Sequence, residues 1–177
     1  RVQALVLGSG WGERKDRGVV ARAVEAGVPL VVDADGLRHL PETGHPKVVL
    51  TPHAGELARL LGNSRAEVEA DPLAAVLTAS RSTGCTVLLK GATQYVAAPD
   101  STRVWLAVPG PAWTAQAGSG DLLAGICGTL LAAGLAPVDA ALAAASVQAV
   151  AAAAAPGPVP PQELPLPVPP HRTRPAE

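Results

Sequence analysis

The chain has 177 residues, 48% of them hydrophobic, and its mean hydropathy of +0.25 is high enough for one domain to bury a sizeable core. Only 16% of the residues are charged, with 14 basic side chains against 15 acidic ones. This composition excludes a largely disordered chain, and the lack of a long run of Lys and Arg argues against binding to a nucleic-acid backbone.

The two cysteines, Cys85 and Cys127, lie in apolar segments without the spacing of a metal or disulfide motif, which favours a reducing cytoplasm. No signal peptide is visible at the start of the chain. The apolar stretch 140–155 contains Gln148 and follows Asp139, so we expect a helix packed within the protein and no membrane span. Because the sequence does not begin with Met, we expect a fragment of a longer chain.

Short aliphatic runs alternate with segments of helical spacing along most of the chain. The runs 4–7, 30–32, 48–50 and 87–89 each end at a small, polar or charged residue and predict buried parallel strands. Segments 19–26, 56–61 and 73–82 predict helices, because a glycine follows each of them closely. The runs 94–97 and 104–107 flank a turn and predict a hairpin at the edge of the sheet. This alternation is typical of the α/β class.

Two apolar helices are expected near the C-terminus, one running from Gly118 to about residue 133 and one over 137–155. We assign residues 1–155 to one domain. Nine of the 22 residues in the segment 156–177 are proline, which disfavours helices and central strands. This segment is predicted to be a disordered tail, and a polyproline segment that binds a partner is the alternative.

Polar side chains and glycines follow the predicted parallel strands. Parallel strands present their carboxyl ends at one edge of a sheet, and open α/β sheets bind ligands there. The residues expected at this edge are the loop 8–12, Asp33, Asp35, the segment 51–53, Lys90, Gly91 and the turn 118–121.

The turn Gly118-Ser119-Gly120-Asp121 carries the strongest chemical signal. Glycines let a ligand approach the backbone, and the first amides of the following helix have no partner within it. We expect these amides, without any Lys or Arg, to bind a phosphoryl group, and Asp121 to take the proton of the acceptor's hydroxyl group. The alternative for Asp121 is an acid that only favours the helix dipole.

Three segments in one order, LTPHAGELARLLG at 50–62, VLLKGA at 87–92 and AGSGDLLAGICGTLL at 117–131, resemble the ADP-dependent (S)-NAD(P)H-hydrate dehydratase family of the ribokinase-like superfamily. VLGSGWG at 6–12 and VVDADGL at 31–37 also match its patterns. The resemblance covers residues 4–155. It implies a ribokinase-like three-layer α/β/α fold with a mainly parallel central sheet, and it implies that the N-terminal part of the domain is missing.

The resemblance also implies an activity in the repair of nicotinamide cofactors. In this family ADP phosphorylates the C6 hydroxyl of the (S) epimer of hydrated NADH or NADPH (NADHX or NADPHX). Phosphate then leaves, so that NAD(P)H and AMP result. Mg²⁺ as cofactor, a homo-oligomer, and an NAD(P)HX epimerase that is fused to the enzyme or works with it are implied as well.

Site residues follow from the same resemblance. Asp121 corresponds to the catalytic base, and the amides of Gly118, Ser119 and Gly120 form the anion hole. Gly12 and His53 contact the hydrated cofactor together with Asp121. The adenine nucleotide is held by Lys90, Gly91, Ala92, Thr93, Gln94 and Gly120. Glu56 orders water bound to magnesium, and Asp33 and Asp35 support that site.

Simpler explanations and other functions stay open at this point. His53 could only cap the helix that follows it, and Lys90 could be a solvated strand end. A vitamin-precursor or sugar kinase of the same superfamily would use the same glycine turn with ATP, although such kinases commonly have Asn where His53 stands. A truncated nucleotide-binding module without catalysis is the third possibility.

Overall fold

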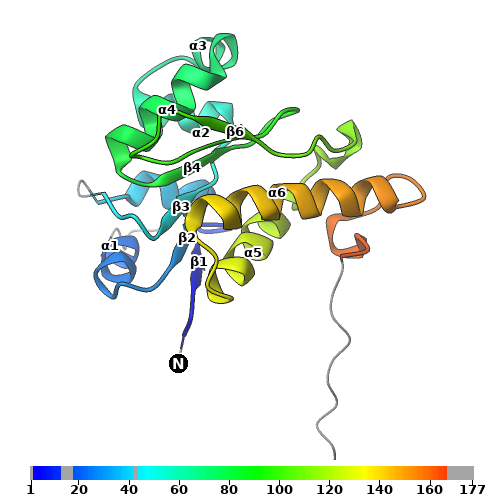
Figure 1. Ribbon diagram of the computed structural model, residues 1–177, viewed down its shortest axis with the longest axis horizontal. Helices are drawn as coiled ribbons and strands as arrows, with labels where there is room; N and C mark the ends of the chain where they lie inside the picture. The colour runs from blue at the N-terminus through cyan, green and yellow to red at the C-terminus, as the bar shows by residue number, and fades with distance from the viewer. Residues whose placement is uncertain (1, 13–17, 42–43, 167–177) are drawn as a thin grey trace, which may run out of the picture.

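A computed structural model of the protein describes residues 2–12, 18–41 and 44–166. Its centre is a six-stranded sheet in the order β1-β2-β3-β4-β5-β6 (Figure 1). The strands β1 to β4 run parallel, and β4, β5 and β6 pair in antiparallel fashion. Their bounds are Leu5–Leu7, Leu30–Val32, Val48–Leu50, Thr86–Leu89, Tyr95–Ala97 and Val104–Leu106. The predicted parallel sheet with a hairpin at its edge is therefore confirmed.

Helices cover both faces of this sheet (Figure 1). One face carries α1 (Gly18–Glu25), α2 (Ala54–Leu61) and α4 (Pro72–Thr83), with the short α3 (Arg65–Ala70) beside α2 and α4. On the other face α5 (Ser119–Ala132) and α6 (Pro137–Ala154) lie side by side. Short 3-10 turns form η1 (Ala34–His39), η2 (Ala112–Thr114) and η3 (Pro161–Glu163). The predicted three-layer architecture is confirmed.

The two core layers follow from the alternation of side chains along each strand. In β2, Leu30 and Val32 pack on the side of α1, α2 and α4, while Val31 packs on the side of α5 and α6. In β3, Val49 likewise points to α5 and α6. Both faces of these strands are covered, so the strands are continuous runs of buried aliphatic residues.

Helix α6 has the length and composition of a membrane-spanning helix, with a mean hydropathy of 1.4 over 18 residues, and 44% of it is buried inside the protein. Its buried side chains are Gln148 and seven alanines, namely Ala140, Ala141, Ala144, Ala145, Ala149, Ala151 and Ala152. Small side chains allow close approach to α5 and to the sheet. In the structure α6 is thus a packed layer of the core.

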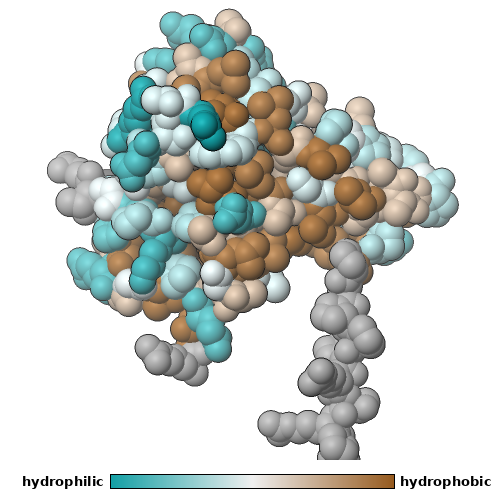
Figure 2. All heavy atoms as spheres, in the orientation of Figure 1, coloured by the Kyte–Doolittle hydropathy of each residue, from teal (hydrophilic) through white to brown (hydrophobic). Residues whose placement is uncertain are grey.

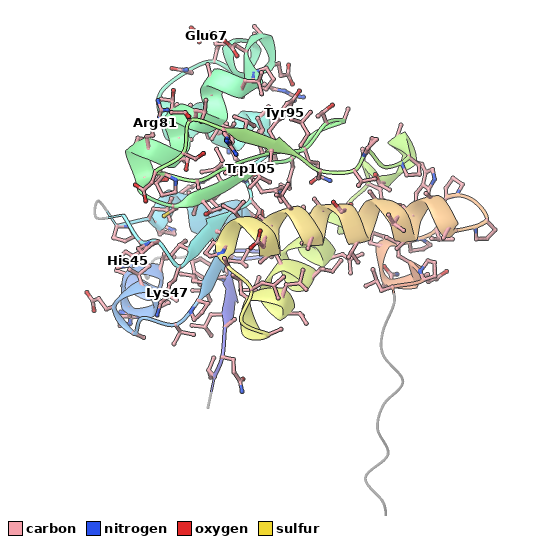
Figure 3. The ribbon with its side chains drawn as sticks, viewed as in Figure 1. His45, Lys47, Glu67, Arg81, Tyr95 and Trp105 are labelled. Carbon is pink, nitrogen blue, oxygen red and sulfur yellow. The ribbon has the colours of Figure 1, made fainter. Side chains whose placement is uncertain are left out.

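The edge hairpin presents one aromatic side chain to each layer (Figure 3). The register pairs Val96 with Trp105 and Tyr95 with Leu106. Trp105 packs on the cluster of α5 and α6, and Tyr95 packs on the opposite cluster. The hairpin is therefore part of both core layers.

The proline-rich segment, predicted to be a disordered tail, begins with residues that contact the rest of the protein. Leu164, next to η3, is 8% exposed, and Gln116 Nε2 donates to the Val159 carbonyl at 2.7 Å. Pro161 lies beside Gly118, at the start of α5. This apolar anchor and the hydrogen bond hold the segment 156–166 on the protein. Residues 167–177 lie outside the described residues.

Candidate active site

Polar side chains gather where the parallel strands end. Asp33 follows β2, Thr51 follows β3 and Lys90 follows β4. Backbone hydrogen bonds continue the strand pairing into this region, since the Asp33 amide donates to Leu7 and the Lys90 amide donates to Pro52, at 2.9 and 2.8 Å. The predicted convergence of these residues at one edge of the sheet is confirmed.

A buried ion pair lies at the centre of this edge. Lys90 Nζ donates to Asp33 Oδ1 at 2.6 Å, and the Thr51 hydroxyl donates to the same oxygen at 2.8 Å. The side chain of Asp33 is 2% exposed and that of Lys90 is 19% exposed. A buried carboxylate keeps its charge when charged and polar donors replace water. Lys90 is therefore a fixed cation and not a solvated strand end.

The N-terminus of α5 lies directly beside this ion pair. A Cβ atom built on Gly120 would be 3.2 Å from Lys90 Nζ and 3.7 Å from Asp33 Oδ2. Gly118 has φ +85°, a conformation that favours glycine, and it turns the chain into the helix. The sequence predicts an anion site made of amides alone. In the structure the Lys90 ammonium, directly after β4, also lies beside the N-terminus of α5.

The amides at this turn are not equivalent. The Ser119 amide donates to the Gln116 carbonyl at 3.2 Å, so it is used within the turn. The amides of Gly120 and Asp121 make no hydrogen bond within the described residues. They remain as donors for an anion at the start of α5.

Gln148 fixes the first residue of α5 from the neighbouring helix. Its Nε2 atom donates to the Ser119 carbonyl at 2.8 Å and to the Ser119 hydroxyl at 3.1 Å. Gln148 is 5% exposed, so this contact is shielded from water. In the sequence Gln148 is a polar residue within an apolar stretch, and this polarity is the available signal for its role.

The predicted base, Asp121, is exposed in the first turn of α5. Within the described part of the chain its carboxylate takes part in no hydrogen bond or ion pair. An acid in the first turn is favoured by the helix dipole, and an accessible carboxylate beside an anion site also fits a proton acceptor. Both explanations of Asp121 agree with this geometry.

His53 caps α2 through a reciprocal pair of hydrogen bonds. Its Nδ1 atom accepts from the amides of Gly55 and Glu56 at 3.0 and 3.2 Å, and Glu56 Oε2 accepts from the His53 amide at 2.8 Å. The capping explanation is therefore confirmed. The imidazole side chain is 54% exposed, so its outer edge is accessible, and its contact with substrate stays a prediction.

Glu56 connects this cap to the ion pair, because Glu56 Oε2 lies 4.0 Å from Lys90 Nζ. The described residues contain no group of three or more His, Cys, Asp and Glu side chains placed to hold a metal ion. Carboxylate oxygens of Asp33 and Glu56 lie on the same side of the sheet edge, at 2.6 and 4.0 Å from the Lys90 ammonium. Such a set suits Mg²⁺ held through water and through the phosphates of a ligand.

The loop 8–12 is tied to the sheet edge through η1. The Gly12 amide donates to Asp35 Oδ2 at 3.0 Å. Gly8 has φ +121°, and a Cβ atom there would lie 1.8 Å from the Asp33 carbonyl oxygen. Only glycine allows this close approach. Asp35 thus positions Gly12, a predicted substrate contact, near Asp33.

The segment predicted to hold the nucleotide forms the connection between β4 and β5. Gly91, Ala92 and Thr93 are exposed. The side-chain oxygen Oε1 of Gln94 is buried without a hydrogen-bond partner among the described residues. An unpaired buried acceptor of this kind is costly unless water or a ligand satisfies it, and the role of this segment in nucleotide binding stays a prediction.

A pocket of about 380 Å³ lies between η1 and α2. Its lining includes Glu56 together with Arg38 and Arg59. These two arginines and the role of Thr51 were not predicted from the sequence. The only available signal for the arginines was their position shortly after Asp33 and His53, two residues expected at the edge.

Comparisons with known proteins give consistent matches. A family model described as NAD(P)H-hydrate dehydratase matches residues 1–160. The chain is 42% identical over 157 residues to the ADP-dependent (S)-NAD(P)H-hydrate dehydratase of Neisseria meningitidis, covering 80% of this chain and 51% of that protein. It is 43% identical over 151 residues to a bifunctional NAD(P)H-hydrate repair enzyme of Mycobacterium tuberculosis, covering 80% of this chain and 30% of that protein.

Solved structures match the fold. An ADP/ATP-dependent NAD(P)H-hydrate dehydratase from Bacillus subtilis, crystallised with ATP and Mg²⁺, superimposes with a TM-score of 0.75 at 27% identity, covering 84% of this chain and 54% of that one. A ribokinase-like superfamily protein from Enterococcus faecalis gives a TM-score of 0.72 at 22% identity, covering 92% and 60%. The ribokinase-like fold is confirmed. The chain spans about half the length, or less, of the curated relatives it matches.

Proposed function

Because the chain belongs to the NAD(P)H-hydrate dehydratase family, we propose that its site catalyses the ADP-dependent dehydration of the (S) epimer of hydrated NADH or NADPH. One observation carries this proposal. The Lys90 ammonium is held by Asp33 at 2.6 Å and lies beside Gly120, at the N-terminus of α5. A fixed cation and unpaired amides around one point are suited to binding a phosphoryl group in transfer.

The first proposed step is phosphorylation of the hydrate. Asp121 takes the proton of the ring hydroxyl while the hydroxyl oxygen attacks the β-phosphorus of ADP. The bond from the β-phosphorus to the bridging oxygen breaks, and AMP leaves. Lys90 and the amides of Gly120 and Asp121 stabilise the charge on the transferred oxygens.

The second proposed step is elimination. The ring C–O bond of the phosphate ester breaks, and inorganic phosphate leaves with the bonding electrons. A proton is lost from the adjacent ring carbon, which restores the double bond of NADH or NADPH. Phosphorylation assists this step because phosphate is a much better leaving group than hydroxide. The products are the reduced cofactor, AMP and phosphate.

Binding roles are proposed on the two sides of the ion pair. The loop 90–94 holds the adenine nucleotide, and the exposure of Gly91, Ala92 and Thr93 supports this role. Gly12 and His53 contact the hydrated cofactor at the ends of β1 and β3. The 54% exposure of the His53 side chain supports this role, while its Nδ1 atom caps α2 and its Nε2 atom lies 3.4 Å from Glu56 Oε1.

Mg²⁺ is proposed to enter with the nucleotide, and Glu56 and Asp33 would hold it through water, where it would neutralise phosphate charge. We predict that ADP-dependent turnover falls to background in excess chelator and returns when Mg²⁺ is added. The rate measured against free Mg²⁺ concentration checks this. Full activity in the presence of the chelator would contradict it.

The proposal is tested by incubating this chain with hydrated NADH or NADPH and ADP. Reduced nicotinamide is followed by its absorbance, and AMP is measured by chromatography. Formation of both in equal amounts is expected. Accumulation of a phosphorylated hydrate without NAD(P)H would identify a kinase instead. Nucleotide binding with no product would identify a binding module, and either result would overturn the proposed reaction.

The proposal also includes an epimerase partner, a homo-oligomer and a cytoplasmic location. The bifunctional naming of relatives supports an NAD(P)HX epimerase as a fused or separate partner. A homo-oligomer is supported by the exposed side chains of Val108 and Val150, which are 49% and 57% exposed. Figure 2 shows hydrophobic residues gathered over α6, where Val150 lies.

The free, buried cysteines support a reducing cytoplasmic location.

A further inference from the structure

The pocket between η1 and α2 is separate from the ion pair but adjoins it. Ala34 in its lining follows Asp33 in the chain, and Glu56 in its lining lies 4.0 Å from Lys90. Its volume of about 380 Å³ lies within the range of about 300–1,000 Å³ typical of small-molecule sites. The remaining lining residues are Leu37, Arg38, Leu40, Arg59 and Leu60.

The two arginines give the pocket a positive character. Arg59 is exposed and forms no ion pair within the described residues. Arg38 approaches Asp35 only at 3.9 Å, with 61% of its side chain exposed, so that ion pair is weak. Glu56 brings one negative charge to the lining, against the two positive charges of the arginines, and its Oε2 atom lies 4.0 Å from Lys90 Nζ. Exposed guanidinium groups without a strong ion pair are suited to binding phosphate oxygens in a bidentate manner.

The apolar part of the lining comes from three leucines, Leu37, Leu40 and Leu60. A pocket with an aliphatic wall and two guanidinium groups is matched by a ligand that carries both a flat apolar ring system and phosphate groups. Nucleotides have this combination, so both ADP and the hydrated dinucleotide are chemically suitable ligands.

The position of the pocket distinguishes these two ligands. It lies after β2 and β3, whereas the loop proposed to hold ADP follows β4. Both elements that form its walls also hold proposed substrate contacts. η1 binds Gly12 through Asp35, and α2 is capped by His53. The pocket is therefore on the substrate side of the ion pair.

We propose that this pocket binds the adenosine and phosphate arm of the hydrated dinucleotide, with Arg38 and Arg59 contacting its phosphates. This inference rests on the proposed function. It concerns the part of the proposed substrate that lies away from the reacting nicotinamide ring. The leucines pack against the adenosine, and the arginines hold the phosphates while the nicotinamide ring reaches Lys90 and Asp121. Arg38 and Arg59 thus contribute to substrate affinity and not to the chemical step.

The test compares Arg59→Ala, Arg38→Ala and the control Arg65→Ala. Arg65 is an exposed arginine on α3, paired with Glu69 at 2.7 Å and absent from the pocket lining. Loss of a charged hydrogen bond to phosphate should raise KM for hydrated NADPH by about tenfold in each pocket variant. KM for ADP and kcat should change by less than about twofold. The KM of Arg59→Lys for hydrated NADPH should lie between the values of the unaltered chain and of Arg59→Ala, since lysine keeps the charge but not the bidentate geometry.

A binding measurement gives a second readout that needs no turnover. Fluorescence titration with intact NADPH should show weaker binding to Arg59→Ala, while reduced nicotinamide riboside, which lacks the phosphates and the adenosine, should bind both proteins alike. Circular dichroism confirms that the variants are folded. A rise in KM for ADP alone would place ADP in the pocket and overturn the inference, as would unchanged values for both substrates. If the unaltered chain binds NADPH but forms no product, the proposed reaction fails and the titration still decides the pocket.

Discussion

The Asp33 carboxylate lies in a nearly water-free position, where both of its identified side-chain donors meet one oxygen. Lys90 Nζ and the Thr51 hydroxyl lie 2.6 and 2.8 Å from Asp33 Oδ1. Removal of one partner from a buried ion pair is costly, since the other charge is left without compensation. Among the described residues, Lys90 would keep Glu56 alone as a charged neighbour, at 4.0 Å. The orientation of the ammonium towards Gly120 therefore depends on Asp33.

We predict that Asp33→Asn lowers the free energy of unfolding by about 3 kcal/mol, the lower end of the range for breaking a buried pair. It should also weaken ADP binding, because Lys90 is no longer aimed at the start of α5. Urea denaturation and ADP titration measure the two effects. Asp100→Asn, in an exposed turn, is the control and should change stability by less than about 0.5 kcal/mol. Equal stabilities of the two variants would contradict the role of Asp33.

A second prediction at the scale of single residues concerns Asp121. Asp121→Asn keeps the size of the side chain but removes its ability to accept a proton. Turnover of the hydrated cofactor should be lost, while ADP affinity stays within a few-fold, because Asp121 acts on the substrate hydroxyl. Stability should change little, since the carboxylate is exposed and has no partner within the described residues. Near-normal activity of this variant would assign Asp121 to the helix dipole alone.

At the scale of elements, strands and long helices were predictable because their apolar patterns are regular. The short α3 was not, since Val68 is its one buried residue. A usable signal does exist in Ser64 and Glu67, which form a capping box. The backbone hydrogen bond from Ser64 lowers the pKa of Glu67. The capping box together with the apolar periodicity predicts this helix.

The location of the candidate site was predictable, but the contacts between its side chains were not. Strand alternation requires the residues after β2, β3 and β4 to share one edge, and this placed Asp33, His53 and Lys90 together. The contact between Lys90 and Asp33 spans 57 positions of sequence. It depends on strand register and on the rotamers of both side chains, which no local pattern determines. The same holds for Gln148 on α6, whose partner Ser119 lies on another helix.

The start of α5 gives a prediction for the element. Gly120→Val would place a branched side chain against Lys90 Nζ and Asp33 Oδ2, where even a Cβ atom lies at 3.2 and 3.7 Å. Loss of one organised donor typically costs about 100- to 1,000-fold in rate, and we expect a loss of that order or larger. Steady-state kinetics and thermal melting measure rate and fold together.

Gly125 provides the matched control in the same helix. A Cβ atom at Gly125 meets nothing within 4 Å, and alanine has the higher helix propensity, by about 1 kcal/mol. Gly125→Ala should therefore keep activity and raise the melting temperature slightly. Normal turnover and normal ADP affinity in Gly120→Val would show that phosphate is not bound at the start of α5.

The whole molecule consists of two core layers separated by the sheet, and each layer contains one free cysteine. Cys85 belongs to the layer of α1, α2 and α4, and Cys127 belongs to the layer of α5 and α6. Both thiols are buried, at 4% and 0% exposure. Burial raises the pKa of the Cys85 thiol, and it raises the pKa of Cys127 to about 12. The two thiols therefore report on the integrity of both layers.

We predict that neither thiol reacts with an aromatic disulfide reagent in the folded protein at about pH 8, and that both react after unfolding in urea. Because the pKa of Cys127 rises to about 12 on folding from its ordinary value of 9.0, its contribution to stability is complete below pH 9 and is lost as the pH rises towards 12. Urea denaturation across this range should show falling stability, with a smaller fall in Cys127→Ala. Labelling of the folded protein at the unfolded rate would show that the α5 and α6 layer does not exclude solvent.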